Sequence, residues 1–548
     1  MTQPREIQSD ASEQERRDAT EDEVATLRHI GDDIPRSAWI ALLLGAAERF
    51  TFYAVTAPWQ NYMQNDADSI AVPGALGLGQ ATATNISNAF YFFAALSPLP
   101  FAVISDVWLG RYKTLCVSFV IYVCACIVMF VTSLPGLGQP ETGRGGLGAT
   151  MILLGLAAGG VKAAIAAFIG DQYTPTTPQL ITKKNGERVV GDRTLTIQYI
   201  FNVYYWFTNI ASLSTVASTY LEKECGFWTA YLMGLSSFSV AVVLLVLWRK
   251  DFVKHSPEGN AIPRASRVLL YAAKDRFRLD AAKRKFQHDR YQRSVPWDDR
   301  FVEEIKRALI ACKVMTWFVL FFLCMNQIGN NLISQAGQMQ LHHVPNDAIP
   351  ALNPVACVIL GPIIQKGLYP FLQKRKIEFR PIARMTVAFI FMSASMAYAA
   401  IVQRLIYNSG PCYEDPLACP ASNAGSAPNN INVWIQVPVY FLVAAAEIFG
   451  FATLFEYSYS KAPKDMKSLV QALSMFASCI ASALGMALST VSTNPEILYL
   501  YAALAAAMIM SSLPFWLWFK RYDEIDEELN RLGLDEEEEK DKIAQSDV

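Results

Sequence analysis

The chain has 548 residues, of which 52% are hydrophobic and only 18% are charged, and its mean hydropathy is +0.21. A soluble protein of this length usually carries more charge, so the composition excludes an ordinary soluble protein. The net charge of −2 indicates no class of partner, because an acidic C-terminal stretch offsets basic loops.

Apolar runs of about 20 residues or more separate the charged blocks, and that length crosses a hydrocarbon core about 30 Å thick. These runs predict an all-α membrane protein with twelve transmembrane helices. In chain order, we expect the spans at roughly 37–63, 85–106, 114–133, 148–170, 197–220, 227–249, 314–335, 351–373, 381–404, 432–458, 469–492 and 496–519.

The charged segments divide the spans into two groups of six. Residues 1–36 are charged and lack the apolar core of a signal peptide, so we expect a disordered cytoplasmic N-terminus. The N-terminal six-helix bundle then covers 37–249, a basic cytoplasmic linker 250–313, and the C-terminal six-helix bundle 314–519. The remaining residues, 520–548, form an acidic cytoplasmic tail, of which we expect residues 525–548 to be disordered. Two six-helix halves are the plan of the major facilitator fold, in which the substrate binds between the halves.

Lys and Arg residues indicate the orientation of the spans. If the N-terminus lies inside, the connections predicted to be external contain almost no Lys or Arg, whereas the internal ones are rich in both. The linker from about 250 to 312 alone holds fifteen of them. Because positive residues concentrate in cytoplasmic loops, we expect both termini in the cytoplasm of a multi-pass protein, in the plasma membrane.

Two connections carry further expectations. The linker sequence RVLLYAAKDRFRLDAAKRKF mixes apolar and basic residues at helical spacing, which predicts a helix lying against the inner membrane surface or the bundle. Cys412 and Cys419 are close together in PCYEDPLACP, a predicted external loop. An oxidising compartment permits a disulfide there, and two unpaired thiols are the alternative.

Four charged residues fall deep within predicted spans: Glu48 and Arg49 in the first, Lys162 in the fourth and Glu447 in the tenth. A charge at that depth costs roughly 2.5–3.5 kcal/mol on insertion scales, so it normally faces a cavity or a partner. Because neighbours on a helix point about 100° apart, we expect Glu48 and Arg49 each to meet a different partner. The four charges form either a transport site or structural ion pairs that fix helix packing.

Polar amides accompany these charges. Asn209 lies in FNVYYWFTNIASL, Asn326 in CMNQIGNNLISQ, and Asn353 opens the eighth span. One amide alone usually serves helix packing, but their concentration in several spans favours a polar cavity. No Cys/His cluster has metal-ligand spacing, and no nucleophile–base or nucleotide motif is present. We therefore expect a protein that is not an enzyme and that uses no cofactor or metal.

Several separate motifs resemble the proton-coupled oligopeptide transporter family, also called POT or PTR, of the major facilitator superfamily. ERFTFYA resembles E-R-F-x-Y-Y-G of the first helix, and DVWLGRYKT resembles the loop D-x-W-L-G-R/K-x-K-T. GGVKAAIAAFIGDQY, FNVYYWFTNIASL and EYSYSKAPKDMKS are similar to later family motifs in the same order. The wording of YAVTAPWQNYMQ and NNLISQAGQM is most similar to fungal members.

This resemblance implies a membrane transporter that imports di- and tripeptides by alternating access, with proton symport. It implies small peptides, protons and the lipid bilayer as partners, and no nucleic acid. By position, the substrate-binding residues would be Arg49 and Lys162 for the peptide carboxylate, Asn209, Asn353 and Glu447 for its amino end, and Tyr53 in the pocket wall. The proton-coupling candidates would be Glu48 and Glu447.

The departures from the family pattern fall on the proton carriers. The first acid of the family's E-x-x-E-R signature is Gly45 here, and the seventh-helix acid of many members is Asn326. The second-helix histidine of animal members is Asn88. We also expect Arg49 to keep Glu48 ionised. Two alternatives therefore stay open: a transporter of another small solute without proton coupling, and a nutrient sensor that binds ligand without transporting it.

Overall fold

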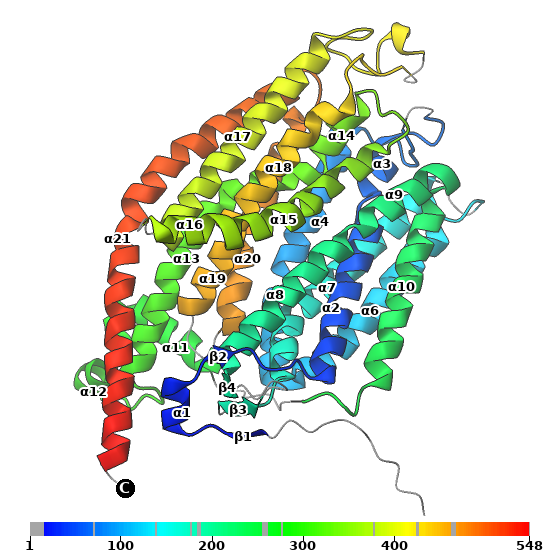
Figure 1. Ribbon diagram of the computed structural model, residues 1–548. Helices are drawn as coiled ribbons and strands as arrows, with labels where there is room; N and C mark the ends of the chain where they lie inside the picture. The colour runs from blue at the N-terminus through cyan, green and yellow to red at the C-terminus, as the bar shows by residue number, and fades with distance from the viewer. Residues whose placement is uncertain are drawn as a thin grey trace, which may run out of the picture.

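The computed structural model describes residues 16–69, 72–136, 140–175, 178–182, 188–254, 261–275, 278–375, 379–423, 427–461 and 467–546. Helices dominate these ranges and run in two adjoining bundles (Figure 1). The first half of the chain forms one bundle and the second half forms the other. The end of the bundles that is opposite the C-terminus is called the distal end below, and the other is called the proximal end.

The N-terminal bundle contains six spans, several of them broken into two pieces. The segments are α2 (Arg36–Thr56) with α3 (Trp59–Gln64), α4 (Gln80–Leu96) with α5 (Pro98–Val103) and η1 (Ile104–Leu109), α6 (Arg111–Thr132), α7 (Pro140–Asp171), α8 (Arg193–Ser212) with α9 (Ser214–Cys225), and α10 (Phe227–Leu247). Proline marks two of these breaks, since Pro58 precedes α3 and Pro98 begins α5. Gly110 and Gly226, with φ of 79° and 97°, turn the chain between successive spans.

The C-terminal bundle repeats the plan of six spans. Its segments are α13 (Asp299–Asn326) with η3 (Gln327–Gly329) and α14 (Asn331–Gly337), η4 (Asn346–Ala351) with α15 (Leu352–Pro362), η5 (Ile363–Leu368) and α16 (Tyr369–Lys374), α17 (Pro381–Tyr407), η7 (Val433–Gln436) with α18 (Val437–Ala446), η8 (Glu447–Phe451) and α19 (Ala452–Lys461), α20 (Lys467–Ala487) and α21 (Ile497–Ser546). Short 3-10 turns, η6 (Pro420–Ser422) and η10 (Ser489–Val491), lie in the distal connections.

Each bundle has its own hydrophobic core. In the N-terminal half, the ring of Phe238 contacts Phe119 and stacks on Tyr122, with centroids 4.9 and 4.2 Å apart. In the C-terminal half, Phe389 contacts Phe318 and Phe515 at 5.1 and 4.9 Å. Aromatic pairs at these distances add attraction beyond their buried area. The two cores are separate clusters, one in each half.

The span prediction agrees with this architecture. Within the described residues, ten helical stretches are long and apolar enough to cross a membrane. The other two predicted spans correspond to α8–α9, which is interrupted at Leu213, and to α20. The helix α8 falls short in hydropathy because it carries several tyrosines and asparagines. The protein is thus an all-α, multi-pass membrane protein with a small sheet at its proximal end.

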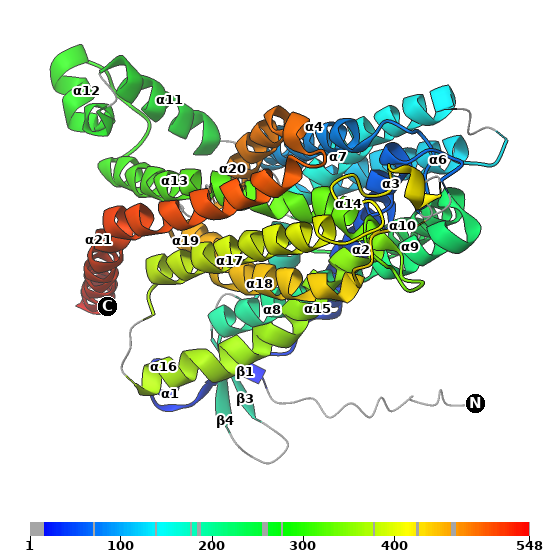
Figure 2. The ribbon, with the colours of Figure 1, turned by 90° about the horizontal axis from the view of Figure 1, so that it is seen from above.

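That sheet corrects the expectation of disorder for residues 16–36, whereas residues 1–15 lie outside the described residues. It has the strand order β1-β3-β4-β2, from β1 (Arg16–Asp18), β2 (His29–Ile30), β3 (Gln179–Thr182) and β4 (Arg188–Gly191). The helix α1 (Glu21–Thr26) connects its first two strands. The pairing fastens the N-terminal segment to the connection between α7 and α8 (Figure 2).

His29 reinforces this attachment. Its Nδ1 lies 3.0 Å from Asp192 Oδ2, and its Nε2 lies 2.7 Å from the carbonyl oxygen of Val24. Two acceptors favour the doubly protonated ring, because an imidazolium donates from both nitrogens. The backbone carbonyl of Val24 and the carboxylate of Asp192 together raise the pKa of His29 above its usual 6.5.

The linker is helical and packs against the bundle, which is one of the two placements that its sequence predicts. The helices α11 (Ala261–Lys274) and α12 (Arg284–Tyr291), with η2 (Leu279–Ala282) between them, lie beside α13 at one edge of the molecule (Figure 2). Val268, Trp297 and Ile305 are buried in a satellite cluster there. The helix α13 begins at Asp299, so the second bundle reaches into the predicted linker, 250–313.

Two further expectations concern the C-terminal half. The helix α21 continues to Ser546, so the tail that was expected to be disordered is helical (Figure 1). Cys412 and Cys419 form a disulfide in the distal connection after α17, which settles the alternative in favour of the bond.

Candidate functional site

Glu48 and Arg49, in the middle of α2, pair with each other. Arg49 Nε donates to Glu48 Oε2 at 2.6 Å, and Nη2 donates to Oε1 at 2.7 Å. Glu48 is only 1% exposed, so its charge is balanced by the guanidinium at close range. The expectation that each would meet a different partner is therefore wrong. Both side chains are long enough to bend toward each other despite the angle between their Cβ atoms.

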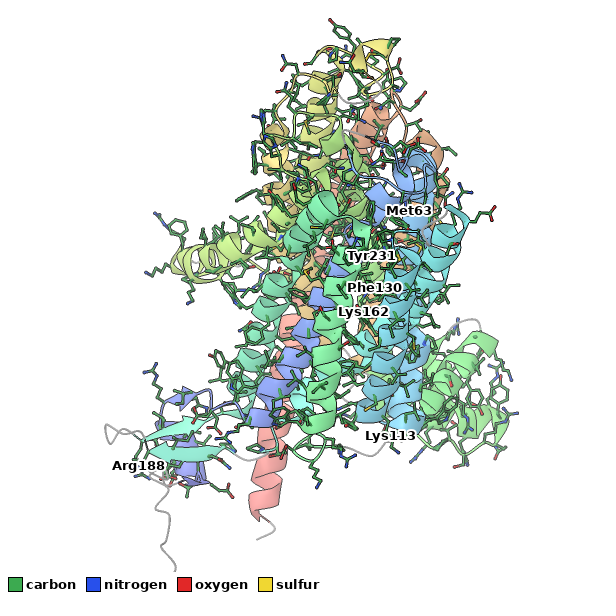
Figure 3. The ribbon with its side chains drawn as sticks, turned by 90° about the vertical axis from the view of Figure 1, so that its right-hand side faces the viewer. Met63, Lys113, Phe130, Lys162, Arg188 and Tyr231 are labelled. Carbon is green, nitrogen blue, oxygen red and sulfur yellow. A yellow bond between two sulfur atoms is a disulfide. The ribbon has the colours of Figure 1, made fainter. Side chains whose placement is uncertain are left out.

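Arg49 and Lys162, the two bases of this half, both lie near the ring of Phe52. Arg49 Cζ lies 5.1 Å from the centroid of the Phe52 ring, and Lys162 Nζ, from α7, lies 5.6 Å from it. A cation near an aromatic ring is attracted by the negative ring face. Figure 3 shows Lys162 about halfway along the bundle. Within the described part of the chain, Lys162 makes no ion pair, so its charge is available to a ligand.

Glu447 is the corresponding acid of the other half. It is the first residue of η8, a π-helical turn inside the tenth span, and such turns are frequent at functional sites. Asn353 Nδ2 donates to both carboxylate oxygens at 3.2 and 3.1 Å, and Cys357 Sγ lies 3.3 Å from Oε2. Asn353 and Cys357 are four residues apart on α15, so they share one helix face. No described cation pairs with Glu447.

Tyr53 lies between these two groups, and Asn209 of α8 lines the same hollow as Cys357. The Tyr53 side chain is 38% exposed and is within electrostatic range of Arg49 on one side and Glu447 on the other. Asn209 donates to the backbone oxygen of Tyr205 at 2.9 Å, on its own helix. It lines a hollow between α8 and α15 whose walls are Tyr205, Trp206, Asn209, Cys357, Val358, Gly361 and Gln365.

The structure therefore gathers all six predicted substrate-binding residues on facing sides of the two halves. The N-terminal half presents the bases, and the C-terminal half presents the acid with its amide. The halves meet here without a described ion pair between Lys162 and Glu447. Such a site offers opposite charges to opposite ends of one ligand in surroundings of low dielectric constant.

Tyr204 explains why Gly45 stands where the family has an acid. A Cβ atom built on Gly45 would lie 2.6 Å from Tyr204 Cε2 and 3.3 Å from Ile165 Cγ1. A carboxylate side chain has no room there unless the tyrosine ring moves. The tyrosine ring fills the space in front of Glu48 and Arg49, and the chain keeps a single acid at that place.

At the other two positions that differ from the family pattern, Asn326 and Asn88 make packing contacts. Asn326 donates to Ser482 Oγ at 3.0 Å, which joins α13 to α20. Asn88 donates to the backbone oxygen of Thr84 at 3.0 Å and packs against Gly485 of α20. Neither amide titrates in the physiological range, so proton binding in this site falls to carboxylates.

Sequence reasoning missed Phe52, Tyr205 and Cys357. The thiol of Cys357 lines the hollow together with Tyr205 and lies 3.3 Å from Glu447 Oε2, so it connects the hollow to the acid. Its spacing of four residues from Asn353 was a usable signal. Phe52 carried none, because an aromatic residue in a membrane helix is most often a packing residue.

Polar contacts join the two halves at the distal end. Asn61 of α3 and Asn346 of η4 exchange amide hydrogen bonds, both at 2.9 Å. Ser334 Oγ donates to Gln64 Oε1 at 2.6 Å, and Lys223 Nζ donates to the backbone oxygen of His343 at 2.8 Å. Asn61, Asn346 and Ser334 are buried, so the distal end of the interface is closed.

Residues 112–506 match the sequence model of the POT family. The chain belongs to this family. Among curated proteins, it is 38% identical to Peptide transporter PTR_A of Candidozyma auris, over 96% of this chain and 88% of that protein. It is 36% identical to Peptide transporter PTR2 of Saccharomyces cerevisiae, over 95% and 85%.

Solved structures of POT transporters share the fold. The crystal structure of the POT family transporter PepTSo aligns with a TM-score of 0.70 at 19% identity, covering 90% of this chain and 99% of that one. A peptide transporter POT variant in complex with alafosfalin aligns with a TM-score of 0.64 at 16% identity, over 89% and 95%. The architecture of twelve helices in two halves is thus that of the POT family.

Proposed function

We propose that this chain imports di- and tripeptides across the membrane by alternating access. The observation that carries the proposal is the separation of charge between the halves: bases at Phe52 and an uncompensated acid at Glu447. A peptide is a zwitterion, so it complements both sides at once. Relatives that match most of the chain are named peptide transporters, which supports this substrate class over other small solutes.

Each end of the peptide has a designated partner. Arg49 and Lys162 bind the carboxylate, and Glu447, with Asn353 and Asn209, binds the amino group. These contacts go to groups common to every peptide, so the side chains are left to pockets such as the wall at Tyr53. Asn353 holds the Glu447 carboxylate in place through two hydrogen bonds, so the acid is oriented before the ligand arrives.

The distal end faces the outside, and the termini lie in the cytoplasm at the plasma membrane. Two independent features support this orientation. The loops at the proximal end hold most of the Lys and Arg residues, and the Cys412–Cys419 disulfide lies at the distal end. Disulfides persist in oxidising compartments outside the cytosol.

Proton coupling, where it operates, is assigned to Glu447. Glu48 already has a full counter-charge in Arg49, whereas Glu447 has only neutral donors. A buried carboxylate without a cation needs a proton or a ligand amine to balance its charge. The proton and the peptide amine thus compensate the same carboxylate at different stages of the cycle.

A second candidate function is the transport of another small charged solute without proton coupling. Gly45 with Tyr204, and Asn326 with Ser482, favour it, because both family proton positions hold groups that do not titrate. Under this alternative the site binds its solute through the same residues, but an imposed proton gradient does not change accumulation.

Uptake of a labelled dipeptide into proteoliposomes, with and without an inward proton gradient, tests the proposal. We expect saturable uptake that unlabelled di- and tripeptides inhibit, and accumulation above equilibrium only with the gradient. Equal, non-concentrative uptake in both conditions would retain the peptide site and reject coupling. An absence of peptide uptake by protein that takes up another solute would overturn the proposal.

A further inference from the structure

Two acids from different halves meet at the closed distal end. Glu222 belongs to α9 and Asp347 to η4, two elements that pack against each other. Their side chains are 2% and 1% exposed. Asn61 places the two acids near each other, because its side chain contacts Glu222 and exchanges hydrogen bonds with Asn346, the residue before Asp347, and the two carboxyl groups interact electrostatically. Neither acid makes an ion pair with a described residue.

The groups around this pair do little to balance the negative charge of two carboxylates. From α3, Asn61 Nδ2 lies 3.4 Å from Glu222 Oε1, but the same amide donates to Asn346 at 2.9 Å. The neighbouring cation, Lys223, donates to the backbone oxygen of His343 at the surface. His342 and His343, which precede η4, are exposed to solvent, as is Glu224 on α9. The one described amide donor at this pair thus reaches Glu222 alone, and it is shared with Asn346.

The carboxyl oxygens that lack a hydrogen-bond donor indicate that one of the two acids is protonated. Glu222 Oε2 and both oxygens of Asp347 have no partner in hydrogen-bonding geometry among the described groups. The hydroxyl of Tyr231, on α10, is also buried without a partner and is within electrostatic range of both acids. Figure 3 places Tyr231 between Lys162 and the distal residue Met63. Such unsatisfied groups are rare in a folded interior, and two contacting carboxylates away from water repel each other.

We propose that Glu222 and Asp347 form a proton-binding latch on the distal gate. One proton from the distal solution binds to either carboxyl, and the resulting O–H donates to the other carboxylate across the interface between the halves. When α9 and η4 separate, both acids become hydrated, and the O–H bond breaks as the proton returns to the same solution. The latch rests on the proposed opening of the distal end, but not on the identity of the solute.

The direction of the pH effect follows from this proton count. The closed gate binds one proton more than the open gate, so acid favours closure and alkali favours opening. A difference of one proton changes the closed-to-open ratio by at most about tenfold per pH unit. The proton enters and leaves on one side of the membrane, so the latch sets the pH dependence of gating without carrying a proton across. It is thereby distinct from coupling at Glu447.

Hydrogen–deuterium exchange of the full chain in lipid nanodiscs, without peptide, tests the latch. Exchange is measured across about pH 5 to 8 and corrected for the intrinsic pH dependence of amide exchange. In the wild-type protein, we expect the backbone amides of α9 and η4 to lose protection from exchange as pH rises. In Glu222→Gln, one amide N–H replaces the shared proton, and the protection should vary less than about twofold over the range.

Two further variants make the outcome decisive. Asp347→Asn is the reciprocal change and should flatten the response in the same way, which covers the case in which Glu222→Gln does not fold. Glu224→Gln removes an exposed acid two residues away and should keep the wild-type response. Protection that does not depend on pH in the wild type, or an unchanged response in both latch variants, would overturn the proposal. Because no peptide is present, either result is independent of the transport assay.

Discussion

The central site and the distal gate both bury acids at the interface between the halves, but they neutralise them differently. Glu447 meets an amide and a thiol from its own half and faces bases across the interface. Glu222 meets another acid across the interface. The first arrangement leaves a charge for a ligand to balance, whereas the second can be balanced only by a proton. The partner of a buried acid, and not the acid itself, thus decides what it binds.

The largest expected effect is the loss of transport when either charge of the central site is removed. Lys162→Ala and Glu447→Gln should each reduce dipeptide uptake by at least about thirtyfold, because loss of a buried charge partner costs roughly 2–5 kcal/mol. Uptake into proteoliposomes measures this effect, and thermal unfolding confirms that each variant is folded. Lys250→Ala and Glu496→Gln, at exposed positions, are the matched controls. Near-normal uptake by either site variant would make these charges structural.

The distal gate should respond differently to the same type of change. The latch makes the initial rate of uptake depend on external pH by up to about tenfold per pH unit. In Glu222→Gln, this part of the pH dependence should be lost. The peptide accumulated at a fixed proton gradient should stay as in the wild type, because the latch carries no proton across. Initial rates and steady-state accumulation in the same proteoliposomes test both statements. A changed accumulation would mean that Glu222 takes part in coupling.

A third prediction concerns the packing that excludes a second acid from the central site. Gly45→Ala should destabilise the protein by roughly 1–3 kcal/mol, because the new Cβ crowds Tyr204 and Ile165. Adding Tyr204→Leu should recover part of that loss, which thermal unfolding of the single and double variants can measure. Gly148→Ala is the control, since no atom lies within 4 Å of its added Cβ. Additive effects of the two changes would contradict the proposed contact.

The smallest effect is expected at the proximal sheet. Because its pKa is raised in the docked N-terminal segment, His29 stabilises docking fully below its usual pKa of 6.5 and loses that contribution as pH rises through the raised value. Hydrogen exchange of the segment 16–30 should therefore increase modestly at alkaline pH. His29→Ala should abolish this pH dependence, and a persisting dependence would assign it to another group.

The fold followed from the sequence wherever the signal was local. An apolar run of about 20 residues has few ways to satisfy its backbone other than a membrane helix, so the spans were predictable one by one. The pairing of Arg16–Asp18 with Gln179–Thr182 was not, because three residues carry no detectable alternation and their partner is distant in sequence. The disulfide was left open for a related reason, since spacing permits a bond without requiring it.

The candidate residues of the proposed site could be named from the sequence, but their contacts could not. Arg49, Lys162 and Glu447 stood out because charge is costly in a membrane span. Sequence could not show that Glu48 would turn to Arg49, because that depends on side-chain conformation. It could not show that Tyr204 would occupy the space at Gly45, because that depends on how α8 packs against α2. The Glu222–Asp347 pair escaped notice because each acid alone resembles a solvated residue at the end of a span.

The most direct test of the central claim is to measure which end of the ligand each half binds. Affinities for a dipeptide, its N-acetylated form and its C-terminal amide would be compared in the wild type, Glu447→Gln and Lys162→Ala. We expect the wild type to bind either modified dipeptide at least about tenfold more weakly than the free dipeptide. Acetylation should no longer weaken binding to Glu447→Gln, and amidation should no longer weaken binding to Lys162→Ala, while each variant stays sensitive to the other modification. If Glu447→Gln discriminates against the acetylated peptide as strongly as the wild type does, the assignment of the amino end to Glu447 is wrong.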